Sequence, residues 1–205
     1  HINKVLQELY QANLSHKPMF YIPGNNDSLH GDYQPFSWKG QSPLTLNPLW
    51  KKACIYCEGL MIDATKMNHS GYYATYVIPD NHDMILFALN STPFAKIPLI
   101  YHYPNQAHAA EKQLDWLETQ LKSNHAKQLL IAMHIPPGKN HHGSPLWHPS
   151  YLKRFISLLS TYSSHYGEIT ILTSHTHMDD IRAITLPNSP PIYAYATPSI
   201  SRIHH

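Results

Sequence analysis

Apolar residues recur at the three- and four-residue spacing of an amphipathic helix in three segments of the chain. The three sets are Ile2, Val5, Leu6 and Leu9; Ala110, Leu114, Leu117 and Leu121; and Leu152, Phe155, Ile156 and Leu159. Lys17 and Pro18 mark the end of the first helix, because proline cannot continue a helix. Each pattern therefore predicts a helix with one buried face.

Strands are predicted by short runs that are rich in branched and aromatic residues and bounded by Asn, Gly, Pro or Asp. The predicted strands are residues 19–22, 54–64, 72–78, 84–89, 128–133, 168–173, 181–186 and 192–196. The three strands between residues 54 and 89 are expected to run antiparallel, and the last two to form a closing pair. Residues 31–53 are expected to be irregular. This order of elements predicts an α/β fold in one domain that spans residues 1–205.

Polar residues follow three of these strands at their carboxyl ends. They are Gly-Asn-Asn-Asp at residues 24–27, His134 before a Pro-Pro-Gly turn, and Ser-His-Thr-His at residues 174–177. In layered α/β folds, sites assemble at the carboxyl ends of strands. Imidazole nitrogen and amide oxygen are common metal ligands, so the three loops together favour a metal site.

Each loop taken alone also has an ordinary structural explanation. Asn and Gly favour a simple turn at residues 24–27. A histidine such as His134 can be satisfied within a protein core. With 17 histidines in 205 residues, a pair such as His175 and His177 also arises by chance. The metal hypothesis depends on the occurrence of all three loops at strand ends.

The order of these motifs resembles the later part of the calcineurin-like metallophosphoesterase family, and within it the acid sphingomyelinase-like phosphodiesterase branch. The resemblance extends from about residue 18 to residue 203. Besides residues 24–27, it rests on residues 89–91, 113–117, 134–138, 175–179 and 197–201, which occur in the family's order.

This resemblance implies a four-layer α/β/β/α sandwich with two mixed sheets packed together and helices outside. It also implies two divalent metal ions, with Asn25, His134 and His175 binding one of them and His177 the other. Zinc, manganese or iron suits such ligands, and zinc is favoured. The implied activity is hydrolysis of a phosphodiester or phosphomonoester by a metal-activated water.

The chain departs from the family pattern at the position of the leaving-group acid. Asn26 stands where many relatives carry a histidine, and asparagine cannot supply a proton. His30, His141 and His142 are the candidate catalytic acids, although each is also explained as a solvated side chain.

A second departure concerns the family's first two motifs, an Asp-x-His pair and a Gly-Asp pair, which precede the Asn motif. The 24 residues before Asn25 contain no aspartate. We therefore expect the chain to be the later part of such a domain, without its initial strands, and to hold at most one metal ion. The sheet edge opened in this way predicts a homodimer or strand exchange.

The composition of the chain limits the classes of molecule that it is expected to bind. The chain is 42% hydrophobic and 14% charged, with a formal charge of +2, so charge implies no nucleic acid. A small phosphoester, such as a phospholipid or a nucleotide, is the expected substrate, with Tyr72, Tyr73, Trp147 and His148 as candidate pocket linings.

No run of about 20 apolar residues and no signal peptide is present, although a removed leader before His1 stays open. An extracytoplasmic or secreted location follows from the resemblance alone. Cys54 and Cys57 are explained by ordinary packing or by a local disulfide.

Two alternatives to a hydrolase stay open. In the first, the chain is a catalytically inactive folded fragment or binding module that keeps a partial, histidine-rich metal site. In the second, it is a histidine-rich α/β domain that binds no metal. Both the hydrolase and the first alternative require metal binding by His134 and His175, whereas the second alternative does not.

Overall fold

The computed structural model describes residues 2–12, 16–46, 54–99, 102–187 and 189–199. Its helices are α1 (Ile2–Ala12), α2 (Pro43–Leu46), α3 (Met67–Ser70), α4 (Gln106–Ser123) and α5 (Pro149–Tyr162), with 3-10 turns η1 (Thr92–Phe94) and η3 (Ser163–His165). Its strands are β1 (Met19–Phe20), β2 (Cys54–Ile55), β3 (Met61–Asp63), β4 (Tyr73–Ile78), β5 (Asn81–Ala88), β6 (Ala126–Ala132), β7 (Tyr166–Thr173), β8 (Asp180–Leu186) and β9 (Ser189–Ala196).

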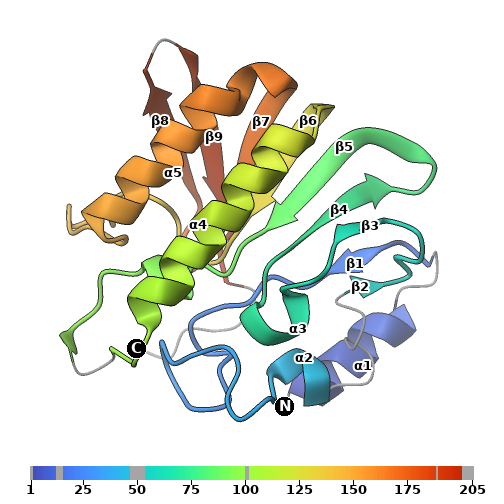
Figure 1. The fold of residues 1–205 in the computed structure, drawn as a ribbon. Helices are drawn as coiled ribbons and strands as arrows, with labels where there is room; N and C mark the ends of the chain where they lie inside the picture. Colours follow the sequence, from blue (N-terminus) through green and yellow to red (C-terminus); the bar gives the residue numbers. More distant parts are fainter. Residues whose placement is uncertain (1, 13–15, 47–53, 100–101, 188, 200–205) are drawn as a thin grey trace.

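A seven-stranded mixed sheet forms the centre of the molecule (Figure 1). Its strand order is β3-β4-β5-β6-β7-β9-β8. The antiparallel pairs are β3 with β4, β4 with β5, and β8 with β9, whereas β5, β6, β7 and β9 run parallel. The antiparallel run and the closing pair expected from the sequence are therefore confirmed.

Helices α4 and α5 cover one face of this sheet (Figure 1). Leu114 and Leu117 of α4 and Phe155 and Leu159 of α5 are fully buried in the main core. Each of these residues lies at helical spacing from its partner, so the apolar stripes seen in the sequence are the faces that pack on the sheet. The two predicted helices are confirmed.

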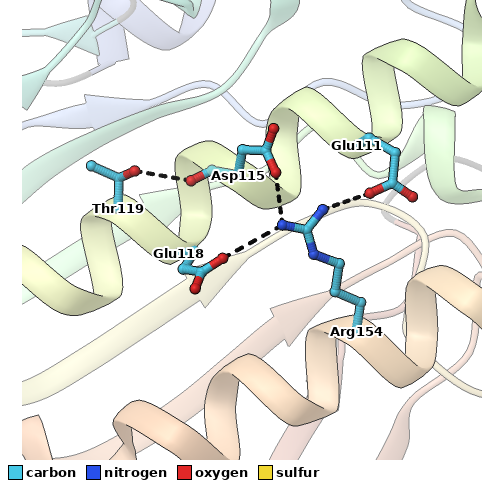
Figure 2. Close-up of polar contacts among 5 residues, drawn as sticks. All are labelled: Glu111, Asp115, Glu118, Thr119 and Arg154. Carbon is cyan, nitrogen blue, oxygen red and sulfur yellow. Dashed lines mark hydrogen bonds and ion pairs between the residues drawn. The ribbon is translucent and has the colours of Figure 1, made fainter.

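An exposed ion-pair network connects α4 and α5 (Figure 2). Arg154 of α5 donates to Glu111 at 2.5 Å, to Asp115 at 2.7 Å and to Glu118 at 3.5 Å, all on α4. Thr119 donates to the backbone oxygen of Asp115 at 3.0 Å. Because Arg154 contacts successive turns of α4, the network fixes how the two helices align while adding little stability per exposed pair.

The other face of the sheet is covered over only part of its width. Tyr73 of β4 and Ala88 of β5 are fully buried there in a second core, beneath the two-stranded antiparallel sheet of β1 and β2. Beyond β6 the described residues leave the same face open, since Leu172, Tyr195 and Ile181 pair across β7, β9 and β8 with 39%, 41% and 69% of their surfaces exposed. Alternation along each strand turns Ile171 and Ala194 towards the helices instead.

The sequence prediction of one strand over residues 54–64 is wrong. Two short strands, β2 and β3, lie there in different sheets. Tyr56 and Gly59 between them have φ angles of 57° and 80°, in the left-handed region that interrupts a strand. Branched and aromatic composition could not reveal this reversal. The segment at residues 31–53 also contains the short helix α2, and residues 47–53 lie outside the described residues.

The structure supports an α/β class with a mixed sheet and helices on it. Within the described residues the second sheet has two strands, β1 and β2, so the four-layer sandwich stays a proposal. Cys57 is disulfide-bonded. None of the helices in the described part of the chain combines the length and apolar character needed to cross a membrane.

Candidate metal centre

Two neighbouring parallel strands bring His134 and His175 to the same edge of the sheet. Ala132 of β6 pairs with Leu172 of β7, and each histidine stands two or three residues beyond its partner in that pair. The backbone nitrogen of Ser174 donates to the carbonyl of His134 at 3.0 Å, so pairing continues past the strand ends. Strand register therefore fixes the separation of the two imidazoles.

The third element is the turn after β1. The backbone nitrogen of Gly24 donates to the Asp27 carboxylate at 2.7 Å, and the backbone nitrogen of Asp27 donates to the Gly24 carbonyl at 3.2 Å. A methyl group on Gly24 would lie 3.3 Å from two ring carbons of His134. Glycine therefore allows the turn to pack directly against this imidazole.

The donor atoms of Asn25, His134 and His175 converge on one point. Nδ1 of His175 lies 3.1 Å from Oδ1 of Asn25 and 3.2 Å from Nε2 of His134. Ligands about 2.0 Å from a tetrahedral zinc ion would be about 3.3 Å apart. The spacing therefore fits a common cation.

Hydrogen bonding alone can supply at most one proton between these three atoms. A neutral imidazole has one N–H group, so Nδ1 of His175 either donates or accepts. If it accepts a proton from His134, it meets the Asn25 oxygen lone pair to lone pair at 3.1 Å, and if it donates, one hydrogen is shared between the Asn25 oxygen and Nε2 of His134. A shared cation would satisfy all three atoms at once.

Asp32 and Tyr33 orient these ligands, and the sequence analysis missed both. The Asn25 amide nitrogen donates to Oδ1 of Asp32 at 2.6 Å, so the amide oxygen must face His175. The hydroxyl of Tyr33 lies 3.4 Å from Nε2 of His175. Asp32 belongs to no motif that can be recognised in the sequence. It lies beside Asn25 because the loop between the two residues folds back. Such outer partners typically tune metal affinity.

Burial keeps the two imidazoles neutral. Desolvation, with contributions from His175 and His177, lowers the pKa of His134 from 6.5 to about 4. Desolvation also lowers the pKa of His175, assisted by His177 and opposed by Asp32. Neutral imidazole has the free lone pair that a cation needs, so neither side chain must lose a proton near pH 7 before binding.

The loop after β7 is conformationally unusual. His175 and His177 have φ angles of 70° and 57°, which non-glycine residues rarely adopt. Between them, Oγ1 of Thr176 is buried and lacks a hydrogen-bond partner among the described residues. Strain and unsatisfied polar atoms of this kind concentrate at functional sites.

All four predicted metal ligands line one cavity of about 310 Å³, which we call the imidazole cavity. Its lining residues are Ile22, Gly24, Asn25, Asn26, Asp27, His134, His175 and His177. His177 is exposed, and it contributes to the lowered pKa of both other histidines. It therefore lies near them, outside the group of three converging donor atoms.

The candidate catalytic acids lie elsewhere. His30 is exposed and contacts Trp38 in a tilted arrangement, with ring centroids 4.6 Å apart. His141 and His142 are exposed and contact each other, with ring centroids 3.7 Å apart. His141 also lines a separate cavity between α5 and β8. None of these three histidines is among the described residues that line the imidazole cavity, whereas Asn26 is.

The described residues contain no cluster of three His, Cys, Asp or Glu side chains arranged to hold a metal ion, so the third donor here is the amide of Asn25. The donor set still suits zinc or manganese, since two neutral imidazoles and one oriented oxygen converge. No protein-family model matches the chain, and no curated protein matches it either.

Proposed function

We propose that the chain is the metal-binding part of a metal-dependent phosphoester hydrolase. The observation that carries the proposal is the convergence of Asn25, His134 and His175 within 3.1 to 3.2 Å at the carboxyl edge of parallel strands. The order of the sequence motifs adds the reaction class, because in the resembling family this ligand set serves phosphoester cleavage.

Each residue has a defined part in the proposal. His134 and His175 present neutral nitrogens, and Asn25 presents an oxygen that Asp32 holds in place. A divalent ion bound there would supply Lewis acidity towards a phosphoryl oxygen and would lower the pKa of a coordinated water. The exposed imidazole of His177, at the same cavity, would serve a second ion or the phosphoryl group.

The second ion of the expected pair needs ligands beyond His177. The open face of β7, β9 and β8 ends at this same edge of the sheet, because Leu172 pairs with both Ala132 and Tyr195 near the strand ends. A further layer packed on that face would complete the four-layer sandwich and would stand beside the imidazole cavity. We propose that carboxylate ligands for the second ion belong to such a layer.

A second candidate is a binding module that holds one ion without catalysis. It is favoured by the same absence of a carboxylate among the three converging donors. The two candidates share the metal site and differ in whether phosphoester cleavage follows.

The experiment is hydrolysis of bis(p-nitrophenyl) phosphate and p-nitrophenyl phosphate by a full-length, metal-loaded preparation that includes the proposed further layer, with added Zn²⁺ or Mn²⁺. We expect release of nitrophenolate that requires the metal and is lost in the double variant His134→Ala, His175→Ala. The matched control is His125→Ala, His165→Ala, which removes a second pair of contacting imidazoles, stacked with ring centroids 4.1 Å apart and outside the cavity.

Two results would decide against the hydrolase. Metal binding without cleavage of either substrate would favour the binding module. Equal activity in both double variants would show that the cleavage does not arise at this site.

A further inference from the structure

A second cavity of about 600 Å³ lies against α4, between the first turns of that helix, α3 and the loop around Trp38. We call it the lysine cavity, and its described lining residues include Trp38, Lys66, Tyr72, Tyr103, Lys112 and Trp116. None of its described lining residues also lines the imidazole cavity. Its volume is in the range of small-molecule sites.

Buried hydrogen bonds make the floor of this cavity rigid. The backbone nitrogen of Asn90 donates to Oε1 of Gln113 at 2.8 Å, and Nε2 of Gln113 donates to the Asn90 carbonyl at 2.7 Å. The Asn90 side chain donates to the Ser70 carbonyl at 3.0 Å. Asn90 and Gln113 are 4% and 1% exposed, so this polar floor is preformed.

The charge of the lining has one sign. Lys66 and Lys112 are exposed at the cavity, His69 and His108 lie beside them, and neither aspartate nor glutamate occurs among the described lining residues. The carboxylate of Asp63 lies behind the wall, where it accepts from Trp116 at 2.7 Å and from Gln120 at 2.9 Å. An anionic group would therefore meet two ammonium groups, although Lys66 is also near enough to Asp63 to help lower the pKa of that carboxyl.

Trp38 offers a flat surface at the mouth. Paired backbone hydrogen bonds with Gln41, at 2.8 and 2.9 Å, fix the turn that carries it. Its indole contacts His30 yet remains 46% exposed. An exposed tryptophan held by a rigid turn favours stacking of a planar ring, because little entropy is lost on binding.

We propose that the lysine cavity binds a small ligand in which a phosphate group is joined to a planar ring, with a mononucleotide as the simplest example. The lysines would hold the phosphate, and Trp38 would stack on the ring. A cationic headgroup such as choline fits poorly, since two lysines would repel it. The site does not depend on the metal centre.

The test is calorimetric titration of the chain with adenosine monophosphate in a chelating buffer at low salt. We expect saturable binding, with adenosine and phosphocholine at least about tenfold weaker. Trp38→Ala should weaken nucleotide binding about tenfold, as expected for loss of base stacking. The double variant Lys66→Met, Lys112→Met should weaken it by at least about tenfold.

Two variants provide controls. Lys122→Met removes an exposed lysine at the other end of α4 and should leave affinity unchanged. His134→Ala alters the imidazole cavity and should also leave it unchanged, so failure of the proposed hydrolase would not affect this result. The proposal is overturned if no binding saturates below about 1 mM, if phosphocholine binds as tightly as the nucleotide, or if the cavity variants bind normally.

Discussion

The two cavities present opposite chemistry to the solvent. The imidazole cavity holds two buried histidines whose pKa values are lowered, so its donors are lone pairs. The lysine cavity exposes the ammonium groups of Lys66 and Lys112 above a neutral floor. The proposed ligands accordingly have opposite charge, a cation for the imidazole cavity and an anion for the lysine cavity.

The difference lies in how each polar group is satisfied. Asn90 and Gln113 satisfy each other in the lysine cavity. In the imidazole cavity, one oxygen of Asn25 and one nitrogen each of His134 and His175 converge around a single shared proton at most. Convergence of lone-pair atoms of this kind supports the proposed metal site.

The largest expected effect concerns pH. His134 has a pKa of about 4 in the folded chain against 6.5 unfolded, so only the unfolded state gains a proton between these values. Stability is complete above pH 6.5 and falls by up to about 3 kcal/mol as the pH approaches 4. Urea unfolding of metal-free protein should show this loss, and His134→Asn should reduce the slope. An identical slope in that variant would contradict the assignment.

The next effect concerns the orientation of Asn25. Asp32→Asn replaces a carboxylate that accepts from the Asn25 amide with a side chain that can also donate. We expect the Zn²⁺ affinity to fall about tenfold, as is typical for an outer partner of a metal ligand. Calorimetry measures it, and nucleotide binding at the lysine cavity serves as the control. Unchanged zinc affinity would show that Asn25 needs no orienting partner.

The smallest effect is steric. Gly24→Ala would place a methyl group 3.3 Å from the His134 ring, which must then shift by a few tenths of an ångström. We expect a loss of zinc affinity of about three- to tenfold with little change in melting temperature. The control is Asn26→Ala, because Asn26 is exposed and lies in the same turn as Gly24. Gly31→Ala is unsuitable, since the φ angle of Gly31 is 108°, which alanine rarely adopts. Equal affinities in the two variants would refute the close-packing argument.

Much of the fold was predictable because it follows from periodicity. The stripes on α4 and α5 and the strands β4 to β7 bury the positions that the sequence pattern selects. The break between β2 and β3 was not, since positive φ angles at Tyr56 and Gly59 leave no hydrophobic signal. Local composition predicts elements, but it does not predict where a strand changes sheets.

The candidate site was predictable to a similar extent. His134 and His175 were found because each follows an apolar strand, and Asn25 because it stands in a turn after one. Asp32 and Tyr33 were missed, since a contact between distant loops is not visible along the chain. Of the pocket linings named from composition, Tyr72 lines the lysine cavity, whereas Tyr73 and Trp147 are fully buried.

Titration of the chain with Zn²⁺, compared with the double variant His134→Ala, His175→Ala, tests the central claim most directly. We expect one zinc ion per wild-type chain and, in the variant, an affinity for zinc that is at least about a hundredfold lower. The variant His125→Ala, His165→Ala should bind zinc as the wild type does. Equal zinc binding by the wild type and the His134, His175 variant would show that these two histidines do not form the zinc site.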